Sequence, residues 1–100
     1  MIKLTVLYGH PTDPATFEDY YVNTHMPLVL KMTGHSRSEA TKFLGAPDGG
    51  QADFYRMFEF WFETTEALQA TMSSPEGQAT AADVPNFATG GATFMVGAVG

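Results

Sequence analysis

FYRMFEFWF, residues 54–62, is the stretch of the chain that decides the fold. Its aromatic and long apolar side chains are typical of a β-strand, in which successive side chains point to opposite faces. One face carries the aromatic residues Phe58, Phe60 and Phe62. The opposite face is also largely apolar and carries Tyr55, Met57, Glu59 and Trp61. Helices of the same chain can cover one face of a sheet, so we expect a second copy of the chain to cover the other.

The remainder of the chain predicts three further strands and three helical segments. Side-chain periodicity and cap residues indicate strands at residues 2–8, 36–44 and 92–99, and helices at residues 14–25, 65–72 and 75–83. The resulting order is strand, helix, strand, strand, helix, strand, with the last helix in two pieces. This order predicts an α+β class and a single domain over residues 1–100. The domain would be a ferredoxin-like (βαββαβ) antiparallel sheet with helices on one face.

Two prolines set the expected limits of the first helix. Asp13 and Pro14 are typical of a helix start, because the carboxylate caps free N–H groups and proline needs no donor at the first helical position. Pro27 disfavours helical geometry at Met26. The regular helix should therefore end or kink near His25.

Charge and composition exclude several classes of protein. The chain has 5 basic and 11 acidic residues, a net charge of −6, and its basic residues are scattered. Because nucleic acids and anionic membranes repel such a surface, we expect neither as a partner. The absence of cysteine excludes disulfides and thiol catalysis. No stretch has the ~20 apolar residues of a membrane span or the apolar core of a secretion signal, so we expect a cytoplasmic protein.

The stretch FEDYYVNTHMPL, residues 17–28, holds the candidate catalytic residues, His25 and Tyr21. They are four residues apart, so on a helix their side chains lie one turn apart on the same side. A hydrogen bond between phenol and imidazole could orient the histidine for proton transfer to or from a carbonyl or enol substrate. The alternative is structural, since a histidine in the last turn of a helix can satisfy free carbonyl groups and interact with the helix dipole.

Aromatic side chains are expected to line a pocket for a small apolar ligand that carries oxygen. We assign substrate binding to Tyr8, Phe17, Phe60 and Trp61. The strand period does not decide which sheet face lines the pocket, so Trp61 is alternatively part of the core between two copies of the chain. Glu59 lies on the same face and needs Lys3 or Arg56 as a partner to stay charged, which favours an interface ion pair over an acid–base role.

The sequence carries no pattern typical of a metal site, and we expect no bound cofactor. His10, His25 and His35 are far apart, and no acidic pair stands at ligand spacing. A single histidine would suffice as an axial ligand of haem, but no basic cluster is available for the haem propionates.

The chain resembles the EthD family over essentially its whole length. The resemblance rests on FEDYYVNTHMPL, on the Asp13-Pro14 helix start before it, and on FEFWF, SPEGQ and ADVPNF after it. Its most specific part is the order Tyr-Tyr-x-x-x-His-x-Pro at residues 20–27. The family is named after a small protein associated with ethyl tert-butyl ether degradation, and it belongs to the dimeric α/β-barrel superfamily.

This resemblance implies a homodimer in which two ferredoxin-like sheets face each other as a dimeric α/β barrel. Related families include cofactor-independent monooxygenases and muconolactone isomerases, so the fold fixes no single reaction. The implied function is an oxidoreductase of the monooxygenase type, or an isomerase or lyase, acting on a small apolar compound in catabolism or secondary metabolism. The alternative is a non-catalytic protein that binds small molecules or supports a partner oxygenase.

Overall fold

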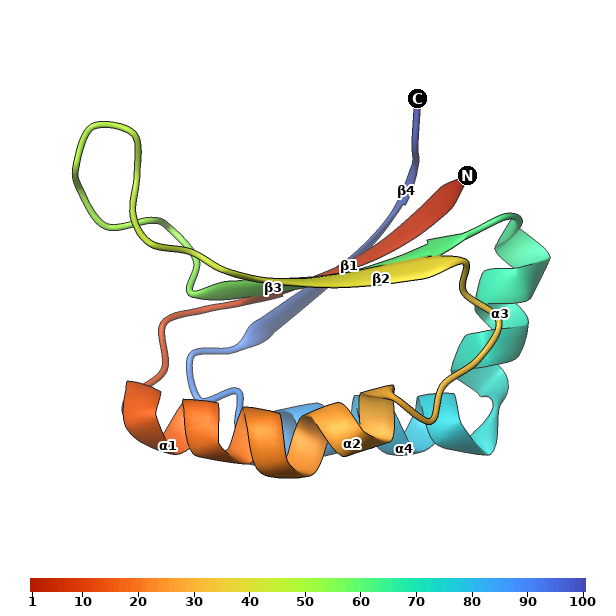
Figure 1. Cartoon of the computed structure of the whole chain (residues 1–100), viewed down its shortest axis with the longest axis horizontal. Coiled ribbons are helices and arrows are strands. Elements are labelled where there is room, and N and C mark those ends of the chain that lie inside the picture. Colours follow the sequence, from red (N-terminus) through yellow and green to blue (C-terminus); the bar gives the residue numbers. More distant parts are fainter.

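Four strands form one antiparallel sheet, and the helices lie on one side of it (Figure 1). The structure is a computed structural model that describes residues 1–100. The strands are β1 (Ile2–Tyr8), β2 (Arg37–Lys42), β3 (Arg56–Phe62) and β4 (Ala92–Ala98), in the sheet order β2-β3-β1-β4. The helices are α1 (Pro14–Tyr20), α2 (Met26–Val29), α3 (Thr65–Ser73) and α4 (Pro75–Asp83), and a 3-10 turn, η2 (Val84–Asn86), follows α4. The predicted ferredoxin-like fold is confirmed, and most predicted ends differ from the observed ones by no more than two residues.

The first helical segment differs most from its prediction, because it contains a wide turn immediately before Pro27. Tyr21–His25 form a π-helical turn, η1, between α1 and α2, and the Met26 N–H donates to the Tyr21 carbonyl. Proline lacks an N–H and its ring crowds the carbonyl four residues earlier, and a wider turn relieves both problems. The helical segment therefore continues to Val29, and the expected interruption near His25 takes the form of a π turn.

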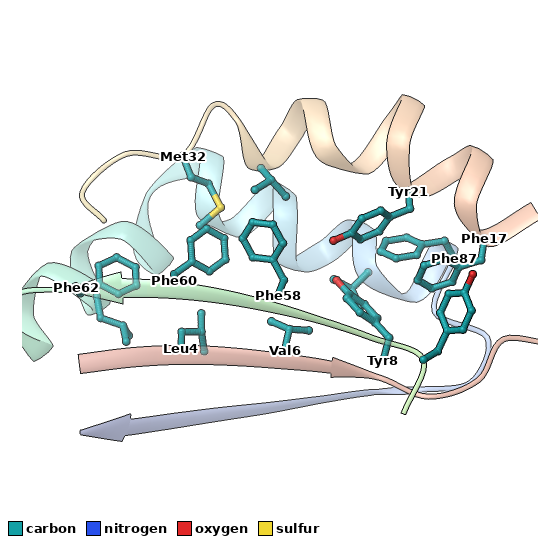
Figure 2. Close-up of a cluster of buried hydrophobic side chains, with 14 residues drawn as sticks. Leu4, Val6, Tyr8, Phe17, Tyr21, Met32, Phe58, Phe60, Phe62 and Phe87 are labelled. Carbon is teal, nitrogen blue, oxygen red and sulfur yellow. The ribbon is translucent and has the colours of Figure 1, made fainter. Parts of the chain in front are cut away.

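The register of the sheet places the aromatic face of β3 under the helices. Leu4 and Val6 of β1 lie opposite Phe60 and Phe58 of β3, and all four side chains point toward the helical layer (Figure 2). Fourteen buried apolar residues form a single core between the two layers. The largest fully buried side chains in it are Tyr8, Phe17 and Phe62.

The segment before β4 lies against the end of β1 and fixes the region around Tyr8. The Gly9 N–H donates to the Gly91 carbonyl at 3.0 Å. A Cβ atom at Gly9 or Gly90 would collide with the backbone of the other segment, so both positions require glycine for this close approach. The approach brings Tyr8 and Phe87 together, with 5.5 Å between their ring centroids.

The second face of the sheet has no helix over it (Figure 1). Strand alternation places Met57 and Trp61 on this face, beside an ion pair of 2.9 Å between Lys3 Nζ and Glu59 Oε2. Lys3 is one of the two partners expected for Glu59. Met95 of the edge strand β4 adds a further exposed apolar side chain to this surface. In the single chain this apolar face is therefore open to water. No helix of the chain is both long and apolar enough to cross a lipid bilayer.

Candidate functional site

His25 is buried where the π turn of the first helical segment meets the end of α4. Its ring Nδ1 lies 2.9 Å from Oδ2 of Asp83, and the residue is only 3% exposed. Phe87 packs against the imidazole with 4.5 Å between ring centroids, and Tyr21 stacks on it at 5.9 Å. A carboxylate at one nitrogen and two neighbouring aromatic rings thus fix the position of the imidazole.

Asp83 is held as a carboxylate by three neutral donors. Oδ1 accepts from the Tyr20 hydroxyl at 2.6 Å and from the Asn86 amide at 3.0 Å, and Oδ2 accepts from His25. Asp83 is the last residue of α4, where the helix dipole disfavours an anion. Burial raises the pKa of Asp83, but the three hydrogen bonds act more strongly together and leave this pKa below its ordinary value. Asp83 is therefore ionised at neutral pH.

This carboxylate determines which nitrogen of His25 is basic. Burial lowers the pKa of His25 below its ordinary value, because the imidazolium loses hydration, although the hydrogen bond to Asp83 acts in the opposite direction. The imidazole is therefore neutral at pH 7. Because Nδ1 faces a carboxylate, the proton lies on Nδ1 and donates to Asp83, which leaves the lone pair on Nε2. Nε2 has no hydrogen-bond partner within the protein.

The lowered pKa of His25 predicts a loss of stability on mild acidification. Unfolded chains bind a proton at an ordinary histidine pKa near 6.5, whereas the folded chain resists protonation at His25. Below this pH the unfolded state therefore binds more protons, and the free energy of unfolding falls by at most about 1.4 kcal/mol per pH unit. Urea denaturation from about pH 7 to about pH 5, at constant protein concentration, should show this slope. His25→Asn should lose it, and equal slopes in both proteins would contradict the assignment.

Tyr21 does not orient His25 through a hydrogen bond, which corrects the expected pairing. Its hydroxyl is buried without a hydrogen-bond partner, and the two rings stack at 30°. The spacing of four residues does bring the side chains together, but the contact is between ring faces. The Arg56 guanidinium, which Glu18 holds through hydrogen bonds of 2.6 and 2.9 Å, lies 4.8 Å from the Tyr21 ring centroid. Burial raises the pKa of Tyr21 to about 12, so the hydroxyl is protonated.

An apolar cavity of about 30 Å³ lies between the sheet and the helices beside His25. It is lined by 13 residues, of which 11 are hydrophobic. Two of the four residues expected to bind substrate, Tyr8 and Phe60, line this cavity together with His25. Phe17 instead packs behind Tyr8, with 5.6 Å between ring centroids, and does not line the cavity.

Trp61 lies on the opposite face of the sheet from His25. Its ring is flanked by Lys3 and Arg37, with the Arg37 guanidinium 4.3 Å from the ring centroid. The structure therefore does not bring Trp61 to the cavity with Tyr8 and Phe60. Its place on the uncovered face agrees with the alternative of a core between two copies of the chain.

The three histidines lie in three separate environments. His10 Nε2 is 2.6 Å from the Ala52 carbonyl, and His35 packs edge-on against Phe60 at 5.3 Å. Nowhere in the chain do three histidine, aspartate or glutamate side chains gather in a way that could hold a metal ion.

Three residues of the site, Asp83, Tyr20 and Asn86, are not apparent from sequence reasoning. In the sequence, Asp83 only ends a helix and Tyr20 is one of two adjacent aromatics. One signal was available, because an aspartate at the C-terminal end of a helix opposes the helix dipole and needs compensating donors. An amide three residues later, in ADVPNF, is one such donor.

Fold and site together define a ferredoxin-like α+β domain with a buried histidine–aspartate pair beside an apolar cavity. The chain belongs to the EthD family, whose EthD domain model matches residues 9–91. It is 39% identical, over 95% of this chain and 91% of the relative, to an uncharacterized 11.0 kDa protein in the thcB-thcC intergenic region of Rhodococcus erythropolis. A crystal structure of an EthD family protein from Bacillus halodurans has a TM-score of 0.91 and 37% identity, covering 99% of this chain and 98% of that chain.

The fold also occurs in more distant proteins. A dimeric ferredoxin-like protein of unknown function from Thermobifida fusca has a TM-score of 0.73 at 12% identity, covering 98% of this chain and 90% of that chain. At this identity the likeness concerns the fold alone.

Proposed function

We propose that this chain is a small homodimeric enzyme that transfers a proton on a small, apolar, oxygen-bearing compound. His25 acts as the base, Asp83 orients it, and the reaction uses no bound organic cofactor. One observation carries the proposal: His25, whose Nδ1 is paired with the Asp83 carboxylate, lines an apolar cavity, and its Nε2 has no hydrogen-bond partner within the protein. General bases are most effective when their pKa lies near the working pH, and imidazole meets this condition.

The proposed proton transfer is compatible with more than one reaction class. An isomerase or lyase begins by removing a proton from carbon or oxygen, and a cofactor-independent oxygenation of the monooxygenase type begins in the same way. Because burial keeps His25 neutral, its first action on a substrate is to accept a proton. This first step is common to all of these classes, and in an isomerase or lyase the same imidazole can then return the proton.

The homodimer is supported by the uncovered face of the sheet. The partly buried Lys3–Glu59 pair and the side chains of Met57, Trp61 and Met95 form a mixed apolar surface without a helix over it. Contiguous apolar surface of this kind marks interfaces between proteins. Facing sheets of two chains would cover it. The helices would then lie on the outer sides of the dimer, and each cavity would stay between the sheet and the helices of its own chain.

The proposal is tested with the wild-type protein and a panel of small ketones, aldehydes and phenols in D2O. Proton NMR should show exchange of a C–H bond for C–D on at least one compound, at a rate above that of buffer alone. Native mass spectrometry of the same sample should give twice the chain mass of 10.8 kDa.

The second candidate function, a non-catalytic binding or accessory protein, is favoured by the almost wholly apolar lining of the cavity. It predicts a bound compound in the mass spectrum and no exchange for any member of the panel.

A further inference from the structure

Two polar atoms at the cavity have no partner within the protein. Nδ1 of His25 is used by Asp83, which leaves Nε2 free, and the hydroxyl of Tyr8, a residue only 2% exposed, makes no hydrogen bond. The remaining polar lining residue, Thr80, already donates to the Glu76 carbonyl at 2.8 Å. Neither atom is fully enclosed by the protein, so each can form a hydrogen bond with a molecule that enters the cavity. Two polar atoms without protein partners on side chains that line one apolar cavity are therefore suited to a ligand that pairs with both.

A second phenol lies directly beside this pair. The Tyr21 hydroxyl is buried without a partner, and it points toward the same region as the Tyr8 hydroxyl (Figure 2). The two ring centroids are 5.9 Å apart. Burial raises the pKa of both phenols, so both are protonated and can only donate to an anionic oxygen. A free basic nitrogen beside phenolic donors is complementary to a molecule in which an oxygen acceptor adjoins an acidic C–H bond.

We propose that the substrate is a carbonyl compound with an acidic α-carbon. The Tyr8 hydroxyl binds the carbonyl oxygen, and the Tyr21 hydroxyl lies next to the Tyr8 hydroxyl. This inference rests on the proposed function of His25. In the step, Nε2 takes a proton from the α-carbon, the electrons of that C–H bond form a carbon–carbon double bond, and the carbonyl π electrons move to oxygen. Tyr8 donates to the resulting enolate oxygen, which stabilises developing charge in an apolar site. The imidazolium returns the proton to carbon, so the step consumes no co-reactant.

The shape of the site limits the size of this substrate. The inner cavity of about 30 Å³ shares Ala81, Val84 and Phe94 with an outer pocket of about 270 Å³. Five of the seven residues that line the outer pocket are hydrophobic. Phe94 lies between the two spaces on the edge strand β4 and is half exposed. A carbonyl group in the inner cavity with a short apolar body in the outer pocket therefore fits both.

The test compares two probes that differ in a single group. A phenol mimics the flat, oxygen-bearing enolate, so we use 4-fluorophenol and 4-fluorotoluene, whose binding is followed by fluorine NMR. The wild-type protein should bind 4-fluorophenol more tightly, because Tyr8 and His25 pair with its oxygen. Tyr8→Phe should weaken the binding of 4-fluorophenol by about tenfold, the value of one buried hydrogen bond. It should leave the binding of 4-fluorotoluene unchanged.

Tyr55→Phe is the matched control. The Tyr55 hydroxyl is also buried without a partner, but Tyr55 lines a different pocket with His10 and Phe43, so this variant should retain the preference for 4-fluorophenol. Urea denaturation shows that each variant is folded. Equal binding of both probes by the wild type, or an unchanged preference in Tyr8→Phe, would overturn the inference. If the wild type exchanges C–H for C–D and Tyr8→Phe does so at the same rate, the inference about Tyr8 is wrong and the proposed function stands. A Tyr8-dependent preference without any exchange would support oxygen binding by Tyr8 and overturn the proposed function.

Discussion

Replacing His25 with alanine is expected to lower the rate of C–H exchange on a substrate by about a hundredfold or more, the usual contribution of a general base. Nε2 of His25 is the only nitrogen of a side chain that lines the cavity. The hydroxyls of Tyr8 and Thr80 in the same lining are far weaker bases at neutral pH. Loss of the imidazole therefore leaves no group that can accept a proton. The rate is measured by proton NMR in D2O for the wild-type protein and the variant.

His25→Asn separates the base from the hydrogen bond to Asp83. The asparagine amide nitrogen occupies nearly the place of Nδ1 and can donate to the carboxylate, but it offers no basic atom in place of Nε2. Both variants should lose exchange, and only His25→Ala should lose stability, by about 1–3 kcal/mol for a buried group left unpaired. His10→Asn, at an exposed histidine outside the cavity, should keep the wild-type rate. A His25→Ala protein that retains more than about a tenth of the rate would contradict a role as base.

The fold could be predicted because its signals are local. Alternation along residues 54–62 depends only on neighbouring side chains, and it separates Phe58 and Phe60 from Trp61 on opposite faces of the sheet, as the structure does. Which of the two faces lies under the helices does not follow from the alternation. Cap residues also act within one helical turn: Asp13 makes the expected hydrogen bonds to helix N–H groups, and Thr64 accepts one at the start of α3. Such contacts are readable from a few residues at a time.

The path of the first helix was harder to predict because two local rules compete. Pro27 removes a helical hydrogen bond, yet Val29 still packs into the core and benefits from a continued helix. The π turn at Tyr21–His25 satisfies both requirements by adding space before the proline. Which compromise a chain adopts depends on packing against the sheet, and this packing is not visible in the helix sequence.

The site could be predicted only in part, because its residues come from segments that are far apart in the sequence. His25 was identified from its own chemistry, but its partner Asp83 is 58 residues away in the sequence. The nearer candidate Tyr21 was favoured by helical spacing alone. Spacing gives proximity of side chains and says nothing about the direction of a hydroxyl, which here points into the core. Contacts made by folding the chain back on itself require the tertiary structure.

Asp83→Ala is expected to lower the free energy of unfolding by about 3 kcal/mol or more. The carboxylate accepts from Tyr20, Asn86 and His25, and its removal leaves all three donors without their acceptor in a largely buried region. The side chain of His25 is only 3% exposed, so water cannot readily replace the lost partner. Small domains are stable by only about 5–15 kcal/mol, so the change is large. Urea denaturation at constant protein concentration measures it.

Asp83→Asn keeps the shape of the side chain and tests its effect on the His25 tautomer. One amide oxygen can still accept from Tyr20 and Asn86, so the loss of stability should be smaller than in Asp83→Ala. The amide NH2 then faces His25, which moves the ring proton from Nδ1 to Nε2 and removes the free base from the cavity. C–H exchange should fall by about a hundredfold or more, as expected for an imidazole in the wrong tautomer. Nitrogen NMR of the ring reports the tautomer directly. If Asp83→Asn keeps the ring proton on Nδ1 and exchanges at the wild-type rate, Asp83 does not orient His25. A loss of stability in Asp83→Ala would then reflect packing alone.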